Sequence, residues 1–137
     1  MLFMKIRTAT KDDAELVKKL HKQHKKHIGN FNLFWIWDKF LEGKTTYTYV
    51  VIDNIAFMRY GYSKKYKANV LYEIGVDVEN TQKGAGRLLY NHLPKPLMLK
   101  CNVDNEIGNK YYQSMGMTKA GITQTKAGEK QNIWWTS

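Results

Sequence analysis

The stretch Val76-Asp77-Val78-Glu79-Asn80-Thr81-Gln82-Lys83-Gly84-Ala85-Gly86-Arg87-Leu88-Leu89-Tyr90 decides the fold of this chain. An apolar run from Val70 to Val78 predicts a strand, and the leucines at 88, 89 and 93 predict a helix after the glycines. Glycines lack the Cβ atoms that keep an anion away from the backbone, and the first turn of a helix presents unpaired N–H groups. Lys83 and Arg87 add positive charge, so the loop is a candidate phosphate site, although two glycines can also serve only to turn the chain.

Two other glycine-loop families fit poorly. A Walker loop places its lysine directly after the last glycine, whereas Lys83 precedes both glycines here. A Rossmann dinucleotide loop needs a third glycine, and Leu89 stands at that place.

Length and composition restrict the class of protein. The chain has 137 residues, enough for one domain spanning 1–137. It has no apolar run of about 18 residues, and its short apolar start does not suit a signal peptide, so we expect a cytoplasmic protein without a membrane span. The single Cys101 lies in an apolar run and is expected in the core. The net charge of +10 favours anionic partners, which include a phosphorylated cofactor, an acidic protein and nucleic acid.

The other elements follow from periodicity and from breakers. Thr10 and Asp13 predict a capping box that opens a helix reaching about Gln23, and Asp53-Asn54 predicts a hairpin turn. Pro94 and Pro96 end the helix after the glycine loop. Strands are predicted at 5–7, 46–53, 55–62, 70–78, 97–103, 118–124 and 132–136, and helices at 10–23, 31–43, 84–93 and 106–115. The order β α α β β β α β α β β predicts an α/β (α+β) domain with a mixed sheet and helices on its faces.

The first two helices carry the residues with open interpretations. His21, His24 and His27 recur every three residues, but no carboxylate or cysteine lies among them, so no metal is expected. The lysines between them are most simply a solvated face. Phe34, Trp35 and Trp37 lie in a segment that is apolar almost all round, which indicates either core packing or the wall of a substrate site.

Two segments together resemble the GNAT acetyltransferase superfamily. The glycine stretch is similar to the acetyl-CoA loop Gln/Arg-x-x-Gly-x-Gly/Ala, with Thr81 in the Gln/Arg place. The second segment, Asn105-Glu106-Ile107-Gly108-Asn109-Lys110-Tyr111-Tyr112-Gln113-Ser114-Met115-Gly116-Met117, is similar to Asn-x-x-Ala-x-x-x-Tyr-x-x-x-Gly-Phe, with Gly108 and Met117 as departures.

The resemblance implies a mixed, mostly antiparallel sheet of about six or seven strands flanked by about four helices, with a splayed parallel strand pair that binds CoA. By analogy, Asn105 and the backbone of Val76 and Val78 contact the pantetheine, Tyr112 protonates the departing thiolate, and either Glu73 or a water takes the proton of the amine. The phosphates of acetyl-CoA are expected at Gln82, Lys83, Gly84, Ala85, Gly86 and Arg87.

The resulting hypothesis is an N-acetyltransferase that moves the acetyl group of acetyl-CoA directly to a primary amine of a small molecule or protein, without a metal. Phe34, Trp35 and Trp37, with residues around Trp134 and Trp135, are expected to wall the acceptor site and to favour a flat or apolar amine over a polyamine. The alternatives are a GNAT-fold enzyme or binding module that acts on nucleic acid, and an inert interaction module. The oligomeric state, a homodimer included, stays open.

Overall fold

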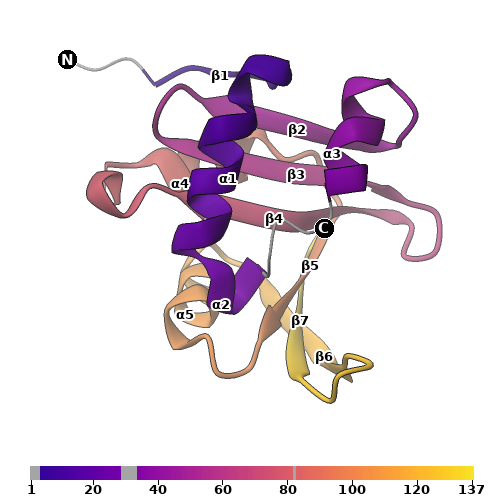
Figure 1. The fold of residues 1–137 in the computed structure, drawn as a ribbon. Coiled ribbons are helices and arrows are strands. Elements are labelled where there is room, and N and C mark those ends of the chain that lie inside the picture. The colour runs from indigo at the N-terminus through magenta and orange to yellow at the C-terminus, as the bar shows by residue number, and fades with distance from the viewer. Residues whose placement is uncertain (1–3, 29–33, 82) are drawn as a thin grey trace.

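The computed structural model of the chain describes residues 4–28, 34–81 and 83–137, and its strands form a single seven-stranded sheet (Figure 1). The strand order is β1-β2-β3-β4-β5-β7-β6, and β4 with β5 is the parallel pair among antiparallel neighbours. This confirms the predicted fold class. The strands are β1 Ile6–Thr8, β2 Tyr47–Ile52, β3 Ala56–Ser63, β4 Ala68–Val76, β5 Leu97–Asn102, β6 Thr118–Gln124 and β7 Lys130–Thr136. The helices are α1 Ala14–Gln23, α2 Lys25–Ile28, α3 Phe34–Leu41, α4 Ala85–His92 and α5 Glu106–Ser114, with 3-10 turns at Lys11–Asp13 and Val78–Asn80.

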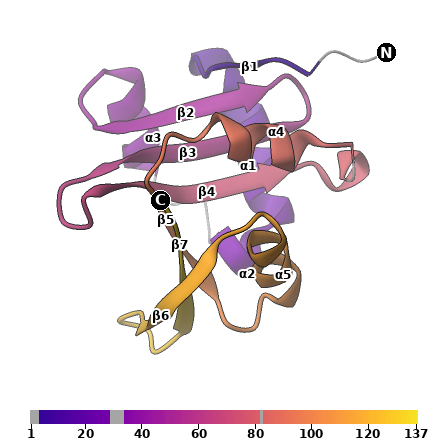
Figure 2. The same cartoon turned by 180° about the vertical axis from the view of Figure 1, so that it is seen from behind.

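Helices cover both faces of the sheet. Figures 1 and 2 show α1 and α3 on one face and α4 on the opposite face. Val17 and Leu20 of α1 pack with Trp37 of α3 in one core cluster, while Leu89 of α4 and Tyr112 of α5 belong to another. The sheet therefore separates the predicted helix-one region from the predicted phosphate loop.

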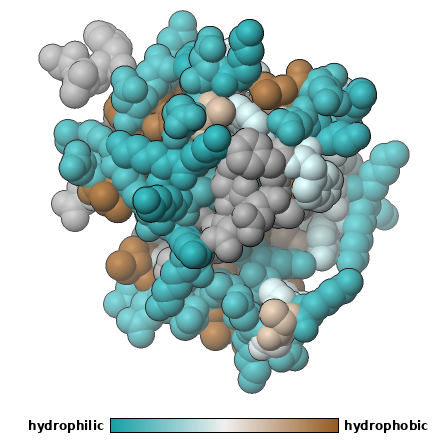
Figure 3. All heavy atoms as spheres, viewed as in Figure 1, coloured by the Kyte–Doolittle hydropathy of each residue, from teal (hydrophilic) through white to brown (hydrophobic). Residues whose placement is uncertain are grey.

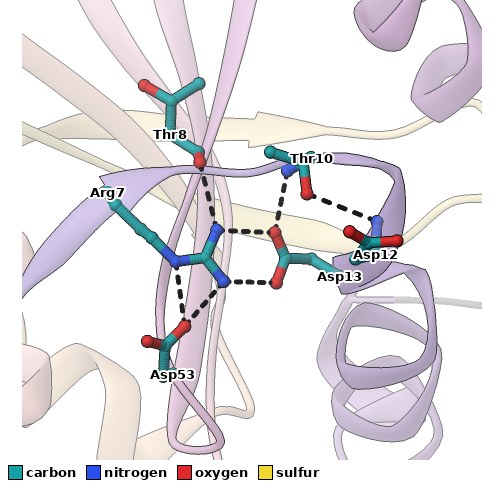
Figure 4. A network of polar contacts seen from close by, with 6 residues as sticks. All are labelled: Arg7, Thr8, Thr10, Asp12, Asp13 and Asp53. Carbon is teal, nitrogen blue, oxygen red and sulfur yellow. Dashed lines mark hydrogen bonds and ion pairs between the residues drawn. The ribbon is translucent and has the colours of Figure 1, made fainter.

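The predicted capping box is present where α1 begins (Figure 4). The Oγ1 of Thr10 accepts a hydrogen bond from the N–H of Asp12 at 3.3 Å, and Oδ2 of Asp13 accepts from the N–H of Thr10 at 2.8 Å. Arg7 of β1 donates to both oxygens of Asp13, at 2.9 and 2.7 Å, and also to Asp53 in the β2–β3 turn. One guanidinium therefore joins a strand, a hairpin turn and the start of a helix.

The lysines of α1 form a solvated face, as predicted. Lys18, Lys19 and Lys22 are all exposed. Figure 3 shows hydrophilic side chains over this helix.

Two predicted features are wrong in detail. The strand before the glycine loop ends at Val76, because Asp77 caps a 3-10 turn with its side chain, and Val78 lies in that turn. Trp134 belongs to β7, which lies between β5 and β6, and its side chain is buried in the core, so it does not wall an open site. Residues 31–33 of the predicted second helix lie outside the described residues.

Candidate active site

A cavity opens where β4 and β5 separate. The two strands pair only from Asn69 with Leu97 to Leu71 with Leu99, although each strand continues for several residues. The register of β3 against β4 shifts at this point, and Tyr72 is the extra residue of a bulge, which bends a strand away from its neighbour. The cavity has a volume of about 400 Å³. Its walls come from β4, β5, α5 and the end of α1, and include His24, Tyr72, Glu73, Thr81, Lys100, Cys101, Asn105, Ile107, Tyr112 and Gln131.

The predicted phosphate loop leads into α4. Gly84 is the N-cap residue and has φ +87°, a conformation that glycine adopts without strain. A Cβ on Gly86 would lie 3.3 Å from the hydroxyl of Tyr111, so α5 packs closely against this turn. Ala85 is buried, whereas Lys83 and Arg87 are exposed and remain able to meet an anion. Gln82 lies outside the described residues.

The end of α1 contacts the backbone groups that the resemblance assigns to pantetheine. The carbonyl oxygen of Val76 lies 2.7 Å from Nε2 of His24, and because a carbonyl only accepts, the imidazole is the donor. The N–H of Val78 donates to Oε1 of Gln23 at 3.1 Å. Asp77 between them accepts from Nε2 of Gln23 at 3.0 Å. In this structure α1 therefore occupies the edge of β4 that faces the cavity.

Asn105 lines the cavity and caps α5. Its Oδ1 accepts from the N–H of Gly108 at 3.0 Å. A Cβ on Gly108 would lie 2.6 Å from Nδ2 of Asn105, so the glycine gives the cap its room. Gly108, which stands where the GNAT motif has alanine, is therefore needed for the conformation that Asn105 adopts here.

Tyr112 lies on α5 against the cavity, next to buried Cys101 of β5. Burial raises the pKa of the Tyr112 phenol well above its usual range, and the neighbouring Cys101 and Tyr111 act in the same direction. Burial likewise raises the pKa of the Cys101 thiol to about 11. Both groups therefore keep their protons at neutral pH, which suits Tyr112 to donate a hydrogen bond or a proton into the cavity.

Glu73 is a buried member of an ion-pair cluster. Its Oε2 lies 3.2 Å from Nε of Arg59 and 3.4 Å from Nε2 of His21. Burial opposes ionisation of this carboxyl, but the hydrogen bond with His21 and the charge of Arg59 outweigh it, so the pKa of Glu73 lies below its ordinary value. A carboxylate held in this way is a weak proton acceptor.

Several solved structures with this fold are acetyltransferases. An acetyltransferase of the GNAT family from Bacillus cereus superposes with a TM-score of 0.75 at 21% identity, covering 99% of this chain and 98% of that chain. NAA60 from Arabidopsis thaliana in complex with acetyl-CoA gives 0.77 at 10% identity, covering 98% of each. The chain has the GNAT fold. A mutant of spermidine N-acetyltransferase SpeG from Vibrio cholerae gives 0.74 at 14% identity, covering 96% of this chain and 94% of that chain. No protein-family model matches the sequence, and no curated protein matches it either.

The aromatic residues predicted to wall the acceptor site of this GNAT fold divide into two groups. Trp35 is 59% exposed and lines a shallow second hollow with Lys39, Lys44 and Tyr47. Trp37 is 2% exposed and packs edge-on against Tyr49, with ring centroids 4.8 Å apart, so its interpretation as a substrate wall is corrected to a core residue. The side chain of Phe34 lies outside the described residues.

The sequence interpretation did not find the cluster around Glu73. The guanidinium carbon of Arg59 lies 4.8 Å from the ring centroid of Tyr47 and 4.7 Å from that of Tyr72. Arg59 and Glu73 are opposite each other in the β3–β4 register. Arg59 and Glu73 each stand in a strand that is predicted to be apolar. Because charged residues are rarely buried unless they are paired, this pattern could have indicated that the two residues form an ion pair.

Neither a metal site nor a membrane-spanning helix is found among the described residues. His21 stacks on Phe57 beneath α1, whereas His24 points to Val76, so these two imidazoles do not converge. The side chain of His27 lies outside the described residues.

Proposed function

We propose that the chain is an N-acetyltransferase that transfers the acetyl group of acetyl-CoA directly to a primary amine of a small molecule or protein. The observation that carries this proposal is the cavity between the separated ends of β4 and β5, which has Tyr112 in its wall. The glycine N-terminus of α4 follows β4 after the 3-10 turn at Val78–Asn80. The GNAT fold supports it. Structural neighbours include a spermidine N-acetyltransferase and a ribosomal-protein-S18-alanine N-acetyltransferase, which act on a polyamine and on a protein.

Acetyl-CoA would supply an acetyl group activated as a thioester. The unpaired N–H groups of the first turn of α4, with Lys83 and Arg87, would bind its phosphates. Asn105 and the backbone of Val76 and Val78 would hold the pantetheine once the end of α1 releases them. Asn105 lines the cavity directly, and Ile74 and Thr81, which also line it, precede and follow residues 76–78 in the chain.

The transfer needs an acid for the departing thiolate and an acceptor for the amine proton. Tyr112 would protonate or hydrogen-bond the departing thiolate, because its phenol stays protonated at neutral pH. Glu73 is paired with Arg59, so a proton relay through solvent in the cavity suits the removal of the amine proton better than direct transfer to Glu73.

Calorimetric titration with acetyl-CoA tests binding. Wild-type protein should bind with a micromolar dissociation constant, and Gly84→Glu should abolish binding because a carboxylate fills the phosphate site. Gly43→Glu is the matched control, since Gly43 also has a positive φ of +71° with open space around it but lies outside the cavity. Absence of wild-type binding, or equal losses in the two variants, would remove the proposal.

Steady-state kinetics test the chemistry. Tyr112→Phe removes the phenolic proton and should lower kcat by about 10²-fold while leaving the dissociation constant of acetyl-CoA nearly unchanged. Unchanged kcat across the pH range would make Tyr112 a packing residue.

The structure does not favour the nucleic-acid alternative over acetyl transfer. Stacking of bases would need exposed aromatic rings, and of Phe34, Trp35 and Trp37 the described structure exposes Trp35, while Trp37 is buried and the side chain of Phe34 is outside the described residues. The exposed lysines of α1 are accounted for as a solvated face.

A further inference from the structure

The charged side chains that line the cavity are Lys100 and Glu73. Among the described residues that line it, Glu73 is the one carboxylate, and its charge is already matched by Arg59 at 3.2 Å. Lys100 of β5 also lines the cavity and is exposed. Lys100 would therefore repel a further cationic group on an acceptor, whereas it could bind an anionic group.

Lys100 faces the α1 side because side chains alternate along a strand. Its neighbours Leu99 and Cys101 are buried in the core on the α4 side, so the ammonium group points the other way. Nζ donates one hydrogen bond to the hydroxyl of Tyr66 at 3.0 Å. An ammonium group has three donors, so two remain for a ligand.

Tyr72 provides an aromatic surface beside this lysine in the cavity wall. It is 39% exposed, and its position in the bulge of β4 turns it out of the ladder. Its ring lies 4.9 Å from the ring of Tyr47, and the guanidinium of Arg59 packs against both rings. Nε of Arg59 donates to Glu73, and no described residue accepts from its two terminal nitrogens. Arg59 thus holds Tyr72 in place without lining the cavity.

We propose that the acceptor is an amine that carries a carboxylate, with Lys100 binding the acid group and Tyr72 contacting the body of the molecule. This inference rests on the proposed function and names its substrate class. A nearby cation also favours the neutral form of the acceptor amine, which is the form that attacks the thioester carbon. The amine nitrogen forms the new amide bond and gives up one proton to solvent in the cavity, the carbon–sulfur bond breaks, and the thiolate receives a proton from Tyr112. Lys100 is a binding residue in this scheme, and Arg59 is a positioning residue that acts through Tyr72.

The test compares amines that differ only in the acid group. Phenylalanine and phenethylamine share ring and amine, and we expect kcat/KM to favour phenylalanine by about tenfold, as one charge-assisted hydrogen bond provides. The dipeptide amides Phe-Glu-amide and Phe-Gln-amide form the second pair. If only the first pair shows a preference, the acceptor is a free amino acid and Lys100 binds its α-carboxylate. If only the second pair shows one, the acceptor is a peptide and Lys100 binds an acidic side chain.

Lys100→Met should remove the preference by raising the KM for the acidic amine, while the KM for its neutral partner stays unchanged. Lys119→Met is the matched control, because Lys119 is also an exposed strand lysine but does not line the cavity. A readout without turnover is calorimetric binding of N-acetylphenylalanine, which Lys100→Met should weaken to the level of N-acetylphenethylamine.

The outcomes separate the two proposals. If acetyl-CoA binds but neither pair shows a preference, or if Lys100→Met keeps the preference, the carboxylate site is wrong and the acetyltransferase proposal stands. If acetyl-CoA does not bind at all, the proposed function itself fails, whatever the binding of the acetylated product shows.

Discussion

Asn109 uses all of its amide group to fix α5 against the sheet. Nδ2 donates to the carbonyl oxygens of Asn102 and Asn105, each at 2.9 Å. Oδ1 accepts from Nδ2 of Asn132 at 3.0 Å and from Nε1 of Trp134 at 2.9 Å. The side chain therefore joins the end of β5, the start of α5 and β7, and it holds the helix that carries Tyr112.

Asn109→Ala should lower the free energy of unfolding by about 2–3 kcal/mol, because it leaves half-buried donors and acceptors without partners. Urea unfolding at pH 7 measures this. Asn91→Ala, at an exposed position of α4, should change the same quantity by less than about 0.5 kcal/mol. Equal effects would mean that the network is incidental.

The two tryptophans of α3 provide a second residue-scale prediction. Trp37→Ala removes a 2% exposed ring and should destabilise the protein by about 3–5 kcal/mol. Trp35→Ala, at a 59% exposed position, should shift stability by less than about 0.5 kcal/mol. Thermal unfolding distinguishes them, and a stable Trp37→Ala protein would contradict the core assignment.

The sequence specified those residues whose roles are local. Thr10 with Asp13, Gly84 and Gly116 act through neighbours a few positions away, and the structure has the capping box and the positive φ values there. Arg59 and Glu73 meet only because of the β3–β4 register, and the bulge at Tyr72 sets that register. A pairing between strands depends on the packing of the whole sheet, so composition and periodicity could not provide it.

At the scale of elements, most boundaries follow from breakers. α4 ends before Pro94, α5 ends before Gly116 at φ +91°, and β6 spans the predicted 118–124. The end of β4 differed because Val78 is apolar and continues the strand pattern, whereas the side chain of Asp77 caps a turn and ends it. The sequence also could not predict that the end of α1 contacts this end of β4, because the contact depends on the angle at which the helix crosses the sheet.

That attachment leads to a prediction on acetyl-CoA binding. If pantetheine uses the carbonyl of Val76, the ligand must first displace His24, and breaking one hydrogen bond costs about 1 kcal/mol. His24→Ala should therefore tighten acetyl-CoA binding by about threefold to tenfold in calorimetry. His92→Ala, an exposed histidine of α4, is the control and should leave the dissociation constant unchanged. Weaker binding in His24→Ala would mean that α1 supports the ligand rather than competing with it.

At the scale of the whole molecule, acid should unfold this protein through two effects that add. The hydrogen bonds from Arg7 hold the pKa of Asp13 below its ordinary value, and those from Gln23 do the same for Asp77. Glu73 also has a lowered pKa, because His21 and Arg59 outweigh its burial. The folded state therefore binds these protons less readily than the unfolded chain, so stability is present above the unfolded pKa values of about 4 and is lost as pH falls below them. The net charge of +10 at pH 7 also rises as carboxylates are protonated, and self-repulsion increases with it.

Asp13→Asn separates the two effects. It removes one titrating group and one ion pair, so the free energy of unfolding should be lower by about 2 kcal/mol at pH 7 and should fall less steeply between about pH 4 and 2 than in the wild type. Asp12→Asn, at the exposed neighbouring position, is the control and should keep the wild-type slope. Added salt should move the acid midpoint of all three proteins to lower pH, because it screens the repulsion among the excess cations. If Asp13→Asn loses stability with acid as steeply as the wild type, repulsion alone drives acid unfolding, and the network at the start of α1 does not contribute to it.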